Sequence, residues 1–444
     1  MSDLSINFDK YERFLKRNRL ENEVGKVVDV VGPMIYGFIP GASIGSICRV
    51  YTRGQNRAFN AEVVGFKDLK SMLMPIGEMR GVSIGSRIEL VRSSATIKVG
   101  DELLGRVIDA TGSPIDDLGE IENLIEEPLY NAVSNPLSRE PIATPLDLGV
   151  RSINGLITVG KGQRVGIMAG SGVGKSVLLG QMAKNSNADV NVIALIGERG
   201  REVREFIEEI LGEEGLKRSV VIVATSDQSP LMRMRGAFIA TTVAEYFCNQ
   251  NKDVLLMMDS VTRFAMAQRE VGLSVGEPPA SKGYTPSVFS LLPKLLERVG
   301  QFSDRGSITG LYTVLVEGDD MDDPIADAVR SIVDGHIVLD RKLAQRGHFP
   351  AVDVLKSTSR VMRNIVDAGH MELANDMRDV MATYQDNADL INIGAYKSGS
   401  NHRIDRAIET NEAIINFLRQ NFDDSSSVDE TLNWMASAMG RQLG

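Results

Sequence analysis

The sequence contains little cysteine and histidine, few aromatic residues and no long apolar run. Its two cysteines, Cys48 and Cys248, lie far apart, so they form no disulfide framework or zinc site and suit a reducing compartment. The four histidines are scattered without the spacing of metal ligands. No apolar run is long enough to span a bilayer, and there is no signal peptide. These absences predict a cytoplasmic protein and leave contact with a membrane surface open.

Positive charge is in the minority, because 49 lysines and arginines face 59 aspartates and glutamates, for a net charge of −10. Together with an aromatic content of 5%, this balance argues against a protein that coats nucleic acid. The hydrophobic content of 43% is that of an ordinary globular protein. At 444 residues the chain is long for one core and predicts roughly two to four domains.

Four segments differ in their residue pattern. Residues 1–22 carry apolar side chains at helical spacing and predict an amphipathic helix, which docks on a partner or a membrane or packs on its own protein. Residues 23–92 alternate β-branched runs with glycine turns and predict a small β-barrel or sandwich. Residues 93–367 begin with a turn-rich connector and then alternate strands with helices, which is typical of a parallel sheet covered on both faces. Residues 368–444 lack strand signals and predict a helical domain.

The centre of the chain is the stretch Ile167–Leu179, IMAGSGVGKSVLL, which predicts a strand, a glycine-rich turn and the start of a helix. Such a turn points backbone N–H groups at a phosphate, and the helix dipole adds positive charge. Lys175 supplies a cation for the β- and γ-phosphates, and Ser176 an oxygen for Mg²⁺. Ala169 replaces the glycine of the strict pattern and is tolerated if its backbone is ordinary; the alternative is a purely structural turn. The candidate nucleotide-binding residues of this stretch are Ala169, Gly170, Ser171, Gly172, Val173, Gly174, Lys175, Ser176 and Val177.

Two acidic residues stand at the ends of apolar strands predicted downstream. Asp259 ends the run VLLMMD, where it would meet Mg²⁺ through water. Glu198 follows the run that ends at Ile196 and is placed to polarise the water that attacks the γ-phosphate. The alternative for Glu198 is a helix cap or a salt bridge among arginines. Ligands of open parallel sheets bind at the carboxyl ends of the strands, so both acids are expected near the glycine turn.

Three further side chains are candidates for the site. Arg263 follows Asp259 by four residues and is placed to face the phosphates. Arg360 is a candidate arginine finger, which would place positive charge where the transition state gathers negative charge, although a surface role is the default for one arginine among many. Phe349 lies beside a proline in a predicted loop, where its ring would stack on a base.

Seven segments carry a family resemblance. They are Ala169–Ser176, GERGRE (197–202), LLMMDS (255–260), SKGYTPSVFSLLPKLLER (281–298), DDMDDPIADAVRSIVDGHIVLDR (319–341), RGHFPAVDVLKSTSR (346–360) and DLINIGAYKSGSNHRIDRAI (389–408). In combination they resemble the ATPases related to the rotary ATP synthase catalytic subunit, and most closely the ATPase of the bacterial flagellar and type III protein export apparatus. The resemblance runs over most of the chain from about residue 24 and is weakest in the first twenty residues.

The resemblance implies a β-barrel, a RecA-like α/β nucleotide-binding domain and a helical C-terminal domain, assembled as a homo-hexameric ring that hydrolyses ATP with Mg²⁺. It implies that Lys175 and Ser176 bind phosphate and Mg²⁺, and that Glu198 is the catalytic carboxylate. Asp259 would lie in the Mg²⁺ shell, and Phe349 against the adenine.

The resemblance also implies that Arg360 acts in trans and completes the site of the neighbouring subunit. The implied partners are a stator-like regulatory protein at the N-terminal helix, an export gate, a stalk-like protein, and export substrates with their chaperones, but no nucleic acid. The protein would be cytoplasmic and peripheral at the inner-membrane export apparatus. There, ATP hydrolysis would promote substrate unfolding, chaperone release and entry into export.

Three alternative functions are less consistent with the sequence than this interpretation. The catalytic subunit of a rotary ATP synthase or vacuolar-type pump should carry an acidic loop where NIGAYKSGSN (392–401) stands. A Rho-like nucleic-acid translocase needs an RNA-binding front domain with exposed aromatic and basic residues, which this composition does not favour. A non-hydrolysing assembly subunit has no support, because Lys175, Glu198 and Asp259 are all present. The sequence does not separate flagellar export from virulence secretion.

Overall fold

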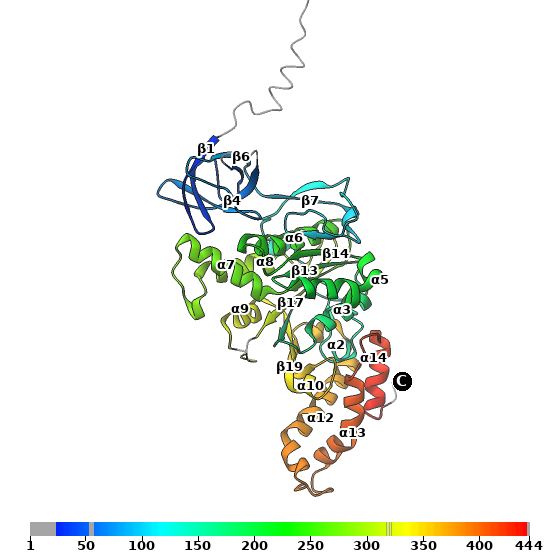
Figure 1. The fold of residues 1–444 in the computed structure, drawn as a ribbon. Helices are drawn as coiled ribbons and strands as arrows, with labels where there is room; N and C mark the ends of the chain where they lie inside the picture. The colour runs from blue at the N-terminus through cyan, green and yellow to red at the C-terminus, as the bar shows by residue number, and fades with distance from the viewer. Residues whose placement is uncertain (1–23, 53–56, 317, 319, 321, 442–444) are drawn as a thin grey trace, which may run out of the picture. The chain divides into compact units, whose positions relative to one another are not determined.

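Figure 1 shows the computed structural model of the chain, which describes residues 24–52, 57–316, 318, 320 and 322–441. The helix predicted within residues 1–22 lies outside the described residues. Internal contacts divide the chain into two compact units. One is built on the residues up to Thr96 with Ser274–Gly276, and the other on Ile97–Leu273 with Glu277–Gly444.

The first unit contains a closed antiparallel barrel with the strand order β1-β2-β5-β4-β3-β6. Its strands are β1 (Val24–Val31), β2 (Met34–Phe38), β3 (Ile47–Tyr51), β4 (Ala58–Lys67), β5 (Lys70–Pro75) and β6 (Arg87–Arg92). Alternate residues such as Val27, Ile35, Val50 and Leu73 point inward and fill the barrel, as the period of two in a strand requires. The predicted β-barrel is therefore confirmed.

The second unit is organised around a nine-stranded sheet whose main path is β19-β18-β12-β17-β15-β13-β14-β8. Adjacent strands on this path from β18 to β8 are parallel. The pairs β18–β19 and β16–β17 are antiparallel. The strands are β8 (Val107–Asp109), β12 (Arg164–Ala169), β13 (Val190–Ile196), β14 (Ser219–Ala224), β15 (Val254–Asp259), β16 (Gly300–Gln301), β17 (Ser307–Leu315), β18 (Gly335–Leu339) and β19 (Val352–Ser359). This order puts β12, β13 and β15 in the interior of the sheet.

The turn-rich connector contributes more than linkage. Its short strand β8 pairs with β14 and forms one edge of the main sheet. Two small ladders also lie in the connector region, one between β7 (Thr96–Val99) and β9 (Ile125–Pro128) and one between β10 (Pro145–Leu146) and β11 (Val159–Gly160). A strand of three residues is too short to be recognised among turn residues, so the sequence pattern did not predict β8.

Helices cover both faces of this sheet, as the pattern predicts. The helices are α2 (Arg151–Leu156), α3 (Lys175–Asn185), α4 (Gly200–Glu205), α5 (Gly212–Lys217), α6 (Pro230–Asn249), α7 (Val261–Val275), α8 (Pro286–Leu296), α9 (Pro324–Ile332), α10 (Arg341–Gln345), α11 (Met362–Ile365), α12 (Ala368–Asn392), α13 (His402–Leu418) and α14 (Val428–Ala438). Leu179 of α3 shares one core with Ile193 and Leu195 of β13. The side chain of Ile196 points to the other face of the sheet, because successive side chains of a strand alternate between faces. There it lies against α6, since a Cβ at Gly236 would come within 2.8 Å of its Cδ1.

The C-terminal helices α12, α13 and α14 gather at one end of the second unit (Figure 1). Their buried residues, including Met377, Phe417 and Met435, belong to the same apolar cluster as the α3 face of the sheet. Helix α2 joins the two regions, because a Cβ at Gly155 would lie 2.4 Å from the sulfur of Met435. A helical C-terminal region is confirmed, while the boundary predicted between residues 367 and 368 stays a prediction, since the core is continuous across it.

Within the part of the chain that the structure describes, no helix is long and apolar enough to cross a bilayer.

A buried arginine connects three parts of the second unit. Arg298 follows α8, and its side chain, 1% exposed, donates to Glu245 of α6 at 2.7 Å from both Nε and Nη2. It also donates to the carbonyl of Leu129 at 3.0 Å and to the hydroxyl of Thr242 at 2.9 Å. Removing the cation leaves Glu245 without its charge partner in a largely buried position.

We expect Arg298→Met to lower the free energy of unfolding by about 3–5 kcal/mol, because breaking a buried ion pair costs that much. Calorimetric melting would measure the change. Lys217→Met is the matched control, since Lys217 pairs with Glu214 at the surface and such pairs contribute little. Equal melting temperatures for the two variants would contradict the assignment.

Candidate active site

The glycine-rich turn joins an interior strand to a helix, as its sequence predicts. β12 ends at Ala169, and α3 begins at Lys175. Gly172 and Gly174 have φ of 76° and 87°, left-handed values that disfavour any side chain, and Gly174 is the N-cap of α3. Ala169 pairs in register with Leu315 and continues the strand, so a side chain meets no backbone penalty there.

Two carboxylates meet Lys175 at the carboxyl edge of the sheet. Asp259 is the last residue of β15, and its side chain is only 3% exposed. The Nζ of Lys175 forms an ion pair with Oδ1 of Asp259 and lies 3.5 Å from Oε1 of Glu198, which follows β13. The hydroxyl of Thr313 donates to the same Oδ1 at 2.7 Å. Residues from three strand ends thus converge beside the glycine turn.

The environment of Glu198 makes it harder to ionise. Burial and the negative charge of Asp259 raise the pKa of Glu198 to about 7, against the opposing effect of Lys175. Glu202, one turn further along, accepts a hydrogen bond from the Glu198 carboxyl, which lowers the pKa of Glu202. A carboxyl group with a pKa near neutrality is suited to accept and release a proton.

Arg263 lies next to the turn that carries Glu198. Gly197 has φ of 74°, and a Cβ placed on it would lie 2.8 Å from Cβ and Cγ of Arg263. Among the described residues, no hydrogen-bond partner reaches the buried Nε of Arg263. An arginine with an unused donor beside the two carboxylates is available to an anion that binds there.

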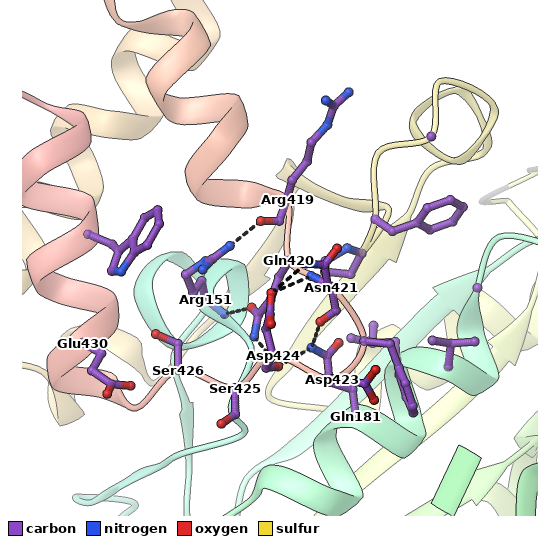
Figure 2. A pocket seen from close by; sticks show the side chains of 18 of the residues that line it. Arg151, Gln181, Arg419, Gln420, Asn421, Asp423, Asp424, Ser425, Ser426 and Glu430 are labelled. Carbon is purple, nitrogen blue, oxygen red and sulfur yellow. Dashed lines mark hydrogen bonds between the residues drawn. The ribbon is translucent and has the colours of Figure 1, made fainter. Parts of the chain in front are cut away.

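Phe349 lies against the glycine turn and lines a cavity of about 1290 Å³, and Figure 2 shows this cavity with several of its other lining residues labelled. The ring of Phe349 is 46% exposed, and a Cβ on Gly174 would lie 3.5 Å from its Cδ1 and Cε1 atoms. The cavity continues along Val177 of α3, so the turn and the predicted base-stacking residue line one space.

The remaining wall of this cavity comes from residues that sequence reasoning did not assign. It is formed by the segment that links α13 to α14, with Asn421, Phe422 and Asp424, and by Gln181 of α3. The ring of Phe422 also lies 4.7 Å from the ammonium group of Lys184. The one local signal was an aromatic residue in a polar loop, which by itself indicates no binding site.

Arg360 is not brought to this site. It follows β19, in which Ser359 pairs with Gly335 at the start of β18, and its N–H donates to the carbonyl of Asp334 at 2.9 Å. Its guanidinium donates to the carbonyl of Arg330 at 3.2 Å. Arg360 therefore lies at the amino edge of the parallel strands, while the glycine turn lies at the carboxyl edge. The six residues of β12 between these edges span about 20 Å.

The oxygen atoms near Lys175 fit a hard cation. Ser176 is the second residue of α3, and the carboxylate of Asp259 lies against Lys175 beside it. Within the described ranges, no group of three or more His, Cys, Asp or Glu residues forms a complete metal cage. Mg²⁺ needs no such cage, because it keeps several waters and is held by one or two protein oxygens with substrate phosphates.

The chain matches two family models and many known proteins. Residues 149–359 match the ATP synthase alpha/beta family, nucleotide-binding domain, and residues 366–437 match the T3SS EscN ATPase C-terminal domain. The flagellum-specific ATP synthase of Bacillus subtilis (strain 168) is 53% identical over 435 residues, which cover 98% of this chain and 97% of that protein.

Solved structures of the EscN ATPase from the type III secretion system of enteropathogenic E. coli are also similar. The assembled ATPase superposes with a TM-score of 0.88 at 46% identity, covering 94% of this chain and 100% of that one. EscN in complex with its central stalk EscO has a TM-score of 0.86 at 45% identity, with the same coverage.

The charges around Glu198 predict how its pKa responds to substitution. Asp259→Asn removes a negative neighbour and should lower the pKa of Glu198 below 7, whereas Lys175→Met removes a positive neighbour and should raise it. Infrared titration of the carboxyl band, with Glu198→Gln as the subtraction blank, would follow both shifts. A pKa that moves the same way in both variants is incompatible with this arrangement.

Proposed function

This chain belongs to the family of flagellum-specific ATP synthases and type III secretion ATPases, which hydrolyse ATP, and we propose that it works as a hexameric motor whose active site is built on Lys175, Glu198 and Asp259. The observation that supports this site most directly is the convergence of these three side chains beside the glycine turn. The same edge of a parallel sheet is where ligands of this fold bind.

The residues divide the work between binding and chemistry. The N–H groups of the turn and Lys175 bind the β- and γ-phosphates, and Arg263 adds a second cation on the side of Glu198. Ser176 and Asp259 would hold Mg²⁺, Asp259 through water, and the bound ion would supply positive charge to the phosphate oxygens. Phe349 stacks against the adenine.

Glu198 orients the attacking water and accepts its proton. Only the ionised carboxylate accepts a proton. With a pKa of about 7, Glu198 changes between its protonated and ionised forms near neutral pH. Burial is the main cause of the raised pKa, and it also strengthens every electrostatic interaction that the water experiences.

Substitution of the two central side chains separates binding from turnover. We expect Lys175→Ala to abolish both ATP binding and hydrolysis, because the phosphates lose their cation. Glu198→Gln should bind ATP normally but turn it over at least 100-fold more slowly, since general base catalysis contributes about 10²–10⁴-fold.

Calorimetric ATP binding and phosphate release, each with Mg²⁺, would measure both effects. In the unsubstituted protein, kcat/KM should rise as the pH increases through about 7, and this rise should be absent in Glu198→Gln. Undiminished hydrolysis by Lys175→Ala, or normal turnover by Glu198→Gln, would overturn the proposed site.

The motor is proposed to act as a ring in which each site uses residues of two subunits. Arg360 lies at the opposite edge of the sheet from the glycine turn of its own chain, which favours action on the site of a neighbour. A positive charge delivered at the transition state is the role of an arginine finger.

Mixing two inactive variants tests this arrangement. Arg360→Ala should lower hydrolysis without weakening ATP binding to the monomer, and Lys175→Ala should be inactive alone. Mixed rings should recover part of the activity, because intact Lys175 sites of one variant meet intact Arg360 residues of the other. Absence of recovery at every mixing ratio would exclude action across subunits.

Within the export apparatus, hydrolysis would promote substrate unfolding, chaperone release and entry into export. The similarity to EscN bound to its central stalk EscO supports a stalk-like partner for this chain. The proposal also includes a stator-like regulatory protein that binds residues 1–22 and contact with an export gate. It places the protein in the cytoplasm, at the inner membrane.

A further inference from the structure

Most of the lining of the cavity beside Phe349 comes from three segments that are distant in sequence, and Arg151 of α2 and Glu430 and Trp434 of α14 line it as well. The three segments are the start of α3, the segment Gly347–Pro350, and residues 419–426 between α13 and α14. Because no wall is continuous with another, their spacing depends on the contacts that tie them together. Two buried glutamines make these contacts, Gln181 through its side chain and Gln420 through its backbone and its side chain, and both are labelled in Figure 2.

Gln181 ties α3 to the segment between α13 and α14. Its side chain is buried, with the residue 2% exposed, and lies on the helix that begins at Lys175. Its Nε2 donates to the carbonyl of Asn421 at 3.1 Å and to that of Asp424 at 3.0 Å. Both hydrogens of the amide are thus used on the backbone of the opposite wall.

Gln420 ties the same segment to the wall that carries Phe349. Its backbone N–H donates to the carbonyl of Phe349 at 3.0 Å. Its side-chain Nε2 donates to the carbonyls of Gly149 at 2.8 Å and Asp424 at 2.9 Å, and its Oε1 accepts from the N–H of Arg151 at 2.9 Å. The carbonyl of Asp424 therefore accepts from both glutamine side chains, which joins α3 to residues 419–426, while the backbone N–H of Gln420 joins these residues to the segment of Phe349.

We propose that Gln181 and Gln420 are positioning residues that set the width of the cavity for the nucleoside part of ATP. This inference rests on the proposed function of the site. Neither amide has a hydrogen left for a base, so both act through the placement of Phe349, Asn421 and Phe422. Their loss would loosen the nucleoside end of the site and leave the phosphate end, at the glycine turn, in place.

Two ligands that differ only in the nucleoside distinguish an effect on the nucleoside end of the site from an effect on the phosphate end. ATP and inorganic tripolyphosphate, each with Mg²⁺, would be titrated into the full-length protein by calorimetry. Gln181→Met keeps the length of the side chain and removes both donors, so we expect about tenfold weaker ATP binding. Tripolyphosphate binding should stay within about twofold of the unsubstituted protein, and KM for ATP should rise with kcat unchanged.

Gln420→Met should give the same split, because it keeps the backbone hydrogen bond to Phe349 but removes the side-chain hydrogen bonds that hold residues 419–426 against Gly149 and Arg151. Gln268→Met is the matched control, since Gln268 is a buried glutamine of α7 that bonds Ser287 outside the cavity. Unchanged ATP binding in both cavity variants would overturn the proposal. So would equal weakening of ATP and tripolyphosphate, which would place the defect at the glycine turn.

If neither cavity variant folds, the amides are required for the fold itself and the positioning role is wrong. Failure of the proposed function looks different, because the unsubstituted protein would then bind neither ATP nor tripolyphosphate. An unsubstituted protein that binds both ligands equally well would show that the cavity makes no use of the nucleoside, which also contradicts the positioning role.

Discussion

The contact of Lys175 with Asp259 and Glu198 is the interaction on which the rest of the site depends. Asp259 is almost fully buried, and burying a carboxylate is costly unless a cation or hydrogen-bond donors pair with it. Lys175 and Thr313 provide them, and their positions follow from the order of strands β12, β17 and β15. The site is thus held by the interior of the sheet, which cannot shift without disturbing the apolar layers on both faces.

The C-terminal helices take part in this organisation. Their core residues merge with the sheet face beneath α3, and the segment between α13 and α14 returns to line the cavity. Arg151 holds this segment between α13 and α14 in place. Its guanidinium donates to the carbonyls of Phe417 and Arg419 and stacks on Trp434, 4.7 Å from the ring centroid. Any displacement of these helices would therefore change the shape of the cavity.

Local patterns predicted the parts of the fold and site that local chemistry determines. The glycine turn, with Asp259 and Glu198 at strand ends, could be predicted because apolar strands expose only their tips at one edge of a parallel sheet. The strands β8, β18 and β19 were not predicted, since they are short or mixed in polarity. Gln181 and Gln420 could not be recognised either, because their partners are backbone carbonyls and no sequence pattern encodes where a distant carbonyl will lie.

The location of Arg360 has a consequence for symmetry. A contact that brings Arg360 of one copy to the glycine turn of the next joins two edges of the sheet that lie about 20 Å apart. A two-fold dimer would make this contact in both directions only if one self-complementary patch reached from one edge of the sheet to the other. A repeated head-to-tail rotation offers every copy a donor and an acceptor without that requirement, and such a chain of contacts must close on itself or grow into a filament.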